Sequence, residues 1–177
     1  MISFNSNYAR SALLAVILTP LFIGVARAQV VAFGASNVSG YGVAEREAFP
    51  AQLQALLRAH GFDVVVLNAG VFGNTTADLR NRSSSDIPQG TKVVILDVSG
   101  PIFNNSLKGI SDAQGRADIA AIEAGLNGRG IKVVEESARE IARRHHQADG
   151  VHLTAEGHRL LAESLLSRVS RALGRSK

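Results

Sequence analysis

Three residues of the chain have the types and spacing that nucleophilic attack on an ester requires. Ser36 stands in the segment Gly34-Ala35-Ser36, directly after an apolar run, and Asp149 and His152 lie three residues apart near the other end of the chain. Hydrolysis through a serine needs a histidine that takes the hydroxyl proton and a carboxylate that orients the histidine. In a turn-like conformation, a carboxylate three residues before a histidine reaches Nδ1 of the ring and leaves Nε2 facing outward. The sequence therefore predicts ester hydrolysis by Ser36, His152 and Asp149.

Each of these signals also has a purely structural interpretation. A Gly-x-Ser segment after a strand is most often a turn, and a carboxylate such as Asp149 is common at the start of a helix with an incidental histidine beside it. The combination is more informative, because Gly73 and Asn104 lie in two intervening segments that also follow apolar runs. Small residues and hydrogen-bond donors gathered at strand ends favour a catalytic arrangement.

Residues that follow strands meet only if the fold brings the strand ends together. Short runs rich in β-branched residues predict four strands, at 29–33, 63–67, 92–97 and 131–134. Amphipathic segments predict helices at 49–60, from a capping box at 111–114 to residue 128, and from 155 to 173, with a polar loop at 81–90. This alternation predicts an α/β fold with a parallel sheet buried on both faces. In such sheets, ligands bind at the carboxyl ends of the strands.

The composition excludes several kinds of site and partner. The chain has 177 residues and no cysteine, which excludes disulfides, thiolate zinc sites, iron–sulfur clusters and cysteine nucleophiles. Outside the first 28 residues, basic and acidic side chains nearly balance, at 17 and 15. A nucleic-acid partner is therefore not expected. The adjacent histidines at 145 and 146 have no carboxylates at metal-ligand spacing, so we expect no metal site.

The first 28 residues have the pattern of an export signal. An apolar run at 11–25 follows Arg10 and ends at Ala26-Arg27-Ala28, which is an A-x-A cleavage pattern. The run is shorter than the roughly 20 residues that span a bilayer, which favours a cleaved signal. The alternative is an uncleaved membrane anchor. We expect cleavage after Ala28, a mature domain at 29–177 that is periplasmic or secreted, no stable membrane anchor after cleavage, and a monomer.

Three blocks of the chain resemble the SGNH, or GDSL-type, hydrolase family, and in particular its small secreted branch of thioesterase and lysophospholipase-like esterases. Residues 34–42 read GASNVSGYG, which is similar to the family's GDSLSxGYG. Residues 68–76 read NAGVFGNTT, close to NAGVSGDTT, and residues 147–158 read QADGVHLTAEGH, which matches the branch almost throughout. The resemblance covers nearly all of the predicted mature domain.

The resemblance implies a fold and a set of roles. The fold would be a three-layer α/β/α sandwich with a parallel, flavodoxin-like sheet of four to five strands. Ser36 would be the nucleophile, His152 the general base and then acid, and Asp149 the residue that orients the histidine. The N–H groups of Ser36 and Gly73, with an asparagine side chain, would form the oxyanion hole. The substrate would be a small-molecule, lipid or glycan ester or thioester, and no cofactor is implied.

The chain departs from the family pattern at three places. Ala35 replaces the aspartate of G-D-S. The family's third block, G-x-N-D, fits only with a two-residue insertion, which makes Asn104 the oxyanion donor and Asn105 the alternative. The segment 135–147 is shorter than the family's usual stretch, so the sheet is expected to have only four full strands. These departures leave a second hypothesis, a catalytically degenerate protein that binds a glycan or lipid without turnover.

Overall fold

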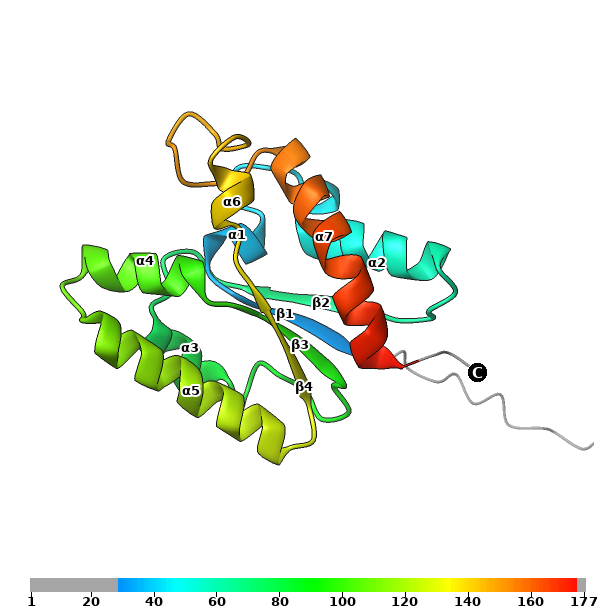
Figure 1. Ribbon diagram of the computed structural model, residues 1–177, viewed down its shortest axis with the longest axis horizontal. Helices are drawn as coiled ribbons and strands as arrows, with labels where there is room; N and C mark the ends of the chain where they lie inside the picture. The colour runs from blue at the N-terminus through cyan, green and yellow to red at the C-terminus, as the bar shows by residue number, and fades with distance from the viewer. Residues whose placement is uncertain (1–28, 175–177) are drawn as a thin grey trace, which may run out of the picture.

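Four parallel strands form the centre of the fold, in the order β2-β1-β3-β4 (Figure 1). The computed structural model describes residues 29–174, with strands β1 (Val30–Gly34), β2 (Val66–Gly70), β3 (Val93–Asp97) and β4 (Lys132–Glu136). Every residue of the two inner strands, β1 and β3, is buried. Burial on both faces explains why these strands are continuous apolar runs. The predicted α/β fold with a parallel sheet is confirmed, whereas the export signal predicted at 1–28 lies outside the described residues.

Helices α2 (Phe49–Ala59) and α7 (Ala155–Leu173) cover one face of the sheet (Figure 1). Alternate residues of the inner strands face them, and these pack with leucines from both helices. The buried cluster on this face includes Val30, Ala32, Val93, Ile95, Leu53, Leu57, Leu161 and Leu165.

Helices α3 (Thr76–Arg82) and α5 (Asp112–Gly128) cover the opposite face (Figure 1). The remaining alternate residues of β1 and β3 point to this side. Their cluster includes Val31, Phe33, Val94, Leu96, Leu79, Ile119, Ile122 and Leu126. The two clusters make three layers, as the period-2 pattern of a doubly covered strand requires.

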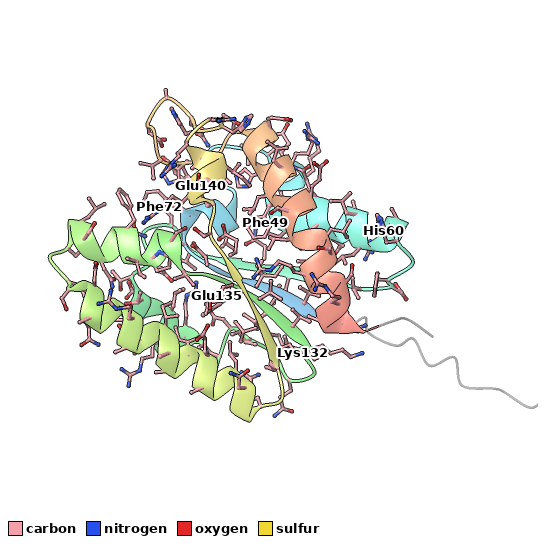
Figure 2. All side chains as sticks on the ribbon, in the orientation of Figure 1. Phe49, His60, Phe72, Lys132, Glu135 and Glu140 are labelled. Carbon is pink, nitrogen blue, oxygen red and sulfur yellow. The ribbon has the colours of Figure 1, made fainter. Side chains whose placement is uncertain are left out.

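The carboxyl ends of the strands carry four short elements: α1 (Ser36–Ser39), the 3₁₀ turn η1 (Glu45–Glu47), α4 (Ser99–Leu107) and α6 (Arg139–Ala142). Figure 2 shows Phe72 and Glu140 at this end of the sheet and Lys132, the first residue of β4, at the other. The connections from β1 and β3 leave in opposite directions here, because β1 lies between β2 and β3. That reversal is where open α/β sheets form a crevice.

Two predictions about elements are corrected by the structure. The second strand is Val66–Gly70 rather than 63–67, because its bounds follow from pairing with β1, where Asn68 lies opposite Ala32 and Gly70 opposite Gly34. Residues 99–107, expected as a segment after a strand, form helix α4, and Pro101 stands in its first turn, where a missing N–H costs nothing. Helix α3 was not predicted. Within residues 29–174, no helix is long and apolar enough to cross a membrane.

Candidate active site

Ser36 lies at the sharp turn between β1 and α1, at the carboxyl edge of the sheet. The turn is tight because Gly34 packs against Val38, where a side chain on residue 34 would have no room. Helix α1 ends after one turn at Gly40, which has a positive φ of 78° and donates its N–H to the Ser36 carbonyl. This geometry directs the Ser36 hydroxyl into the cavity that the strand-end segments enclose.

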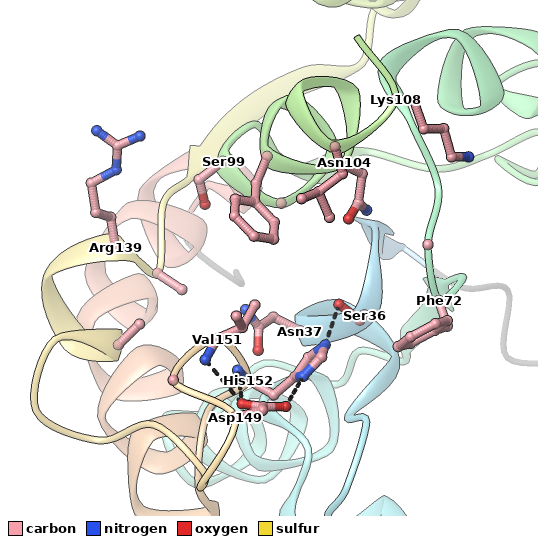
Figure 3. A pocket seen from close by; sticks show the side chains of 17 residues that line it. Ser36, Asn37, Phe72, Ser99, Asn104, Lys108, Arg139, Asp149, Val151 and His152 are labelled. Carbon is pink, nitrogen blue, oxygen red and sulfur yellow. Dashed lines mark hydrogen bonds and ion pairs between the residues drawn. The ribbon is translucent and has the colours of Figure 1, made fainter. Parts of the chain in front are cut away.

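The structure brings Ser36, His152 and Asp149 together in one chain of hydrogen bonds (Figure 3). His152 Nε2 lies 2.9 Å from Ser36 Oγ, and His152 Nδ1 lies 2.5 Å from Asp149 Oδ2. An ionised Asp149 accepts the Nδ1 hydrogen, which leaves the Nε2 lone pair facing the serine hydroxyl. The arrangement can therefore accept the hydroxyl proton of Ser36 as the oxygen attacks an electrophile.

Asp149 is held in its charged form. Its second oxygen, Oδ1, accepts the backbone N–H groups of Val151 at 2.9 Å and His152 at 3.0 Å. The hydrogen bond from the His152 ring, followed by these two N–H groups, lowers the pKa of Asp149 from its ordinary value. The turn from Asp149 to His152 thus fixes both the carboxylate and the ring, as the spacing of three predicts.

Gln147 anchors the segment that carries the histidine. Its side-chain amide donates to the carbonyls of Tyr41 and Leu153, both at 2.8 Å, and its backbone N–H donates to the His152 carbonyl. Gly42, with a φ of 79°, packs so closely against the Gln147 amide that a side chain there would collide with it. This role could not be predicted from the sequence, because a lone glutamine in a loop carries no signal.

The predicted oxyanion donors lie on three different segments around the cavity. The N–H of Ser36 is at the first position of α1, where a helix has no internal partner for it. Gly73 lines the cavity with a φ of 74°. Asn104 lines it from α4, and its side-chain Nδ2 is oriented by donation to the Asn74 carbonyl at 2.8 Å.

The two asparagines that the sequence leaves open differ in their surroundings. Asn105 is 1% exposed, and its side chain bonds to the backbone N–H and the hydroxyl of Thr76. It joins α4 to α3 and does not line the cavity, whereas Asn104 does. The position of Asn104 supports the alignment with an insertion, and its catalytic role stays a prediction.

Arg82 holds several backbone segments around the site in place through hydrogen bonds of its side chain. Its guanidinium donates to the carbonyls of Gly34 and Ala69, at the ends of β1 and β2, and to the Asn74 side chain at 2.6 Å. It also lies 4.3 Å from the centroid of the Phe33 ring. One side chain thus ties the nucleophile turn to the segment that holds Gly73. From the sequence, Arg82 was expected only in a polar loop, whereas it is the last residue of α3.

The cavity next to Ser36 has a volume of about 570 Å³ and a wall that is mostly apolar. Phe72 and Leu107 on this wall are 59% and 70% exposed, and Phe103 is also exposed. The Tyr41 ring is tilted against both Phe72 and His152, at centroid distances of 4.7 and 4.5 Å, and the Phe72 and His152 rings stack at 5.9 Å. All the large hydrophobic side chains that are exposed within residues 29–174 belong to this rim or adjoin it, namely Tyr41, Val71, Phe72, Phe103 and Leu107. Such a concentration marks a ligand-binding surface.

Comparison with known proteins adds a set of similar structures. No family model matches the chain, and no curated protein matches it significantly. Among solved structures, it is similar to TesA, with a TM-score of 0.72, 19% identity, and coverage of 81% of this chain and 98% of that one. It is similar to the psychrotrophic esterase EstA from Pseudoalteromonas sp., with a TM-score of 0.70, 15% identity, and coverage of 82% and 98%. It is also similar to AlinE4, an SGNH-hydrolase family esterase, with a TM-score of 0.57, 27% identity, and coverage of 82% and 96%.

Proposed function

This chain belongs to the SGNH hydrolase family and is an ester-hydrolysing serine hydrolase, and from that premise we propose that it is exported and acts through Ser36, His152 and Asp149. The observation that carries the assignment of residues is the continuous hydrogen-bond chain from Ser36 Oγ through the His152 ring to Asp149. The proposed substrate is a carboxylic ester or thioester.

In the first half of the reaction, Ser36 Oγ attacks the carbonyl carbon while His152 Nε2 takes the hydroxyl proton. The negative charge on the carbonyl oxygen is stabilised by the N–H groups of Ser36 and Gly73 and by the Asn104 amide. Each donor of this kind contributes roughly 10²- to 10³-fold in rate. When the tetrahedral intermediate collapses, the bond to the alcohol or thiol breaks, and His152 gives the leaving group its proton. The product is an acyl ester of Ser36.

In the second half, water replaces the alcohol. His152 takes a proton from the water as its oxygen attacks the acyl carbon, and then returns that proton to Ser36 Oγ as the acid leaves. Asp149 stays ionised throughout and stabilises the imidazolium that forms in both halves. Its lowered pKa supports this role, because the Asp149 carboxylate stays charged at neutral pH.

The apolar wall of the cavity favours an ester with an apolar acyl group over an acetyl ester. The cavity volume lies in the range of pockets that enclose a whole small molecule. Phe72, Phe103 and Leu107 offer a continuous apolar surface beside the nucleophile. Each methylene buried there contributes about 0.8 kcal/mol. We therefore expect octanoyl esters to be better substrates than acetyl esters.

Hydrolysis of p-nitrophenyl acetate, butyrate and octanoate tests the proposal. Ser36→Ala is expected to lose turnover on all three esters with an unchanged circular dichroism spectrum. Ser106→Ala, which removes an exposed serine that lies outside the cavity lining, is the matched control and should keep full activity. Covalent labelling by a fluorophosphonate, located by mass spectrometry, should fall on Ser36.

Two outcomes contradict the proposal. Undiminished turnover in Ser36→Ala would exclude Ser36 as the nucleophile. A wild-type protein that neither hydrolyses the esters nor accepts the phosphonate, yet binds a lipid or glycan, would instead be the degenerate binding protein. Export is tested separately: the N-terminal residue of the protein recovered from the periplasm or medium should be Gln29.

A further inference from the structure

Two buried carboxyl groups lie beneath the nucleophile turn, and the reaction described above uses neither. Asp97 is the last residue of β3, Glu136 is the last residue of β4, and the two are register partners in the sheet. Each is 1% exposed. Charged side chains are seldom buried this completely without a partner, so the pair calls for an explanation.

Asp97 connects the nucleophile turn to the cavity wall. Its Oδ2 accepts the N–H of Ala35 at 3.1 Å, and its Oδ1 accepts the N–H of Gly100 at 2.9 Å. Ala35 immediately precedes Ser36, and Gly100 lines the cavity at the start of α4. One carboxylate therefore sets the distance between the serine and the helix that carries Asn104.

The backbone at Gly34 and at Gly100 packs directly against the Asp97 carboxylate. A Cβ atom on Gly34 would lie 2.9 Å from Asp97 Oδ2, and a Cβ atom on Gly100 would lie 2.6 Å from the same oxygen. Real Cβ atoms do not approach oxygen so closely, so neither position accepts a side chain without a shift of the turn or the helix. The two glycines let both segments close onto Asp97.

The surroundings of the pair decide which member carries the charge. Two carboxylates this close and this buried do not both ionise readily, because neither is solvated and they repel each other. Asp97 accepts two N–H groups, which favour its ionised form, whereas neither oxygen of Glu136 has a hydrogen-bond partner among the described residues. Burial, and then the charge of Asp97, raise the pKa of Glu136 well above its ordinary value. Arg168 on α7 opposes this increase. The proton therefore resides on Glu136.

We propose that Asp97 is a positioning residue for Ser36, and that Glu136 in its neutral form keeps the Asp97 carboxylate in place. The proposal rests on Ser36 being the nucleophile. When Glu136 loses its proton as pH rises, the two negative charges repel, and the contact of Asp97 with Ala35 and Gly100 weakens. The pair then sets an alkaline limit to turnover.

Two variants of nearly unchanged size test the pair. Asp97→Asn replaces one acceptor oxygen with an amide that cannot accept an N–H, and is expected to lower kcat about 10- to 100-fold with little change in KM. Glu136→Gln is permanently neutral, and its kcat should persist to higher pH than that of the wild-type protein. Glu135→Gln removes an exposed carboxylate from the adjacent position of β4 and should behave as the wild-type protein. Melting temperatures from pH 5 to 10 report on the same proton without any substrate. The unfolded chain releases this proton near the ordinary glutamate pKa and the folded protein only at higher pH, so the wild-type protein should lose more stability than Glu136→Gln as pH rises through this window.

The two readouts separate the failure of this proposal from a failure of the proposed function. If the alkaline limit of kcat and the alkaline loss of stability are the same in Glu136→Gln and the wild-type protein, Glu136 does not hold the proton. If Asp97→Asn folds and keeps its kcat, Asp97 does not position Ser36. If Asp97→Asn does not fold, the dependence of kcat on pH in Glu136→Gln still tests whether the pair limits turnover. Absence of phosphonate labelling and turnover in the wild-type protein would instead contradict the proposed function.

Discussion

The side-chain oxygen of Asn37 accepts the backbone N–H of Leu153 at 3.0 Å, so the residue after the proposed nucleophile is bonded directly to the residue after the histidine. The contact joins α1 to the loop before α7. It connects the two segments that carry Ser36 and His152, whose side chains lie 2.9 Å apart at Oγ and Nε2.

Loss of this contact should loosen the serine–histidine pair. Asn37→Ala leaves the partly buried N–H of Leu153 without an acceptor, which costs about 1 to 3 kcal/mol. We expect kcat to fall about tenfold or more, because misplacement of reacting groups is costly, while the fold persists. Steady-state kinetics on p-nitrophenyl butyrate measure the effect. Asn127→Ala, at an exposed position near the end of α5, is the control, and equal kcat values in the two variants would refute the prediction.

Arg82 should matter for both stability and activity. Arg82→Lys removes the planar group that donates to Gly34, Ala69 and Asn74 at once, and a lysine ammonium cannot reproduce that geometry. We expect a loss of about 2 kcal/mol or more in the free energy of unfolding, measured by urea denaturation, together with a lower kcat. Arg80→Lys is a fair comparison, because Arg80 is largely exposed and pairs only with Asp118. A similar cost for both variants would assign Arg82 no special role.

Truncation of the cavity wall should change the preference for acyl length. Phe72→Ala and Phe103→Ala remove apolar surface next to the nucleophile and delete none of the hydrogen bonds that join Ser36, His152 and Asp149. We expect kcat/KM to fall for the octanoyl ester by about tenfold, which corresponds to the burial of roughly two methylenes, and to change little for the acetyl ester. The ratio of the two values in each variant is the measurement. A parallel decrease for both esters would show that these side chains support the site and do not bind the acyl group.

His158 should make the fold sensitive to acid. The side chain is fully buried, and its Nδ1 accepts the N–H of Phe49 at 3.3 Å. Burial, and then the charge of His152, lower its pKa from 6.5 to about 4. The unfolded chain therefore binds a proton between these pH values that the folded protein does not, and stability falls as pH decreases through this window. The loss approaches about 3 kcal/mol at most.

Comparison of variants isolates this effect, since the raised pKa values of Asp97 and Glu136 change stability in the opposite direction over part of the same range. Denaturation at pH 7 and pH 4.5 should show a smaller acid loss in His158→Gln than in the wild-type protein. His60→Gln, at an exposed position near the end of α2 (Figure 2), serves as the control. An acid loss in His158→Gln as large as that of the wild-type protein would contradict the assignment.

Much of the fold could be predicted because its determinants are local. The strands β1 and β3 are apolar runs between turn residues, and α2, α5 and α7 have apolar stripes at helical spacing with caps at their ends. The bounds of β2 were wrong because pairing with β1 sets them. Helix α4 was missed because Gly100 and Pro101 normally interrupt helices, and the acceptor for the Gly100 N–H, Asp97, precedes the helix.

The candidate site was predictable to the extent that it follows from short segments. Asp149 and His152 form one turn, so their spacing in the sequence already indicated that the carboxylate would contact the ring. The residues that connect distant segments have no comparable pattern in the sequence. Arg82 and Gln147 act on backbone atoms dozens of residues away, and nothing in their own surroundings in the sequence indicates the target. The pairing of Asp97 with Glu136 likewise depends on the register of two strands that helices α4 and α5 separate in the sequence.

Ser36 and His152 are 116 residues apart in the chain, so the two groups of the proposed triad leave the ribosome at different times. A nascent chain that has emerged as far as α5 contains the turn with Ser36 and strands β1, β2 and β3, but it lacks β4 and the histidine that is proposed to take the serine proton. The loop with Asp149 and His152 emerges later and needs the following helix, α7, to close the core beneath it. With the proposed triad, chains that stop before α7 are therefore expected to lack esterase activity.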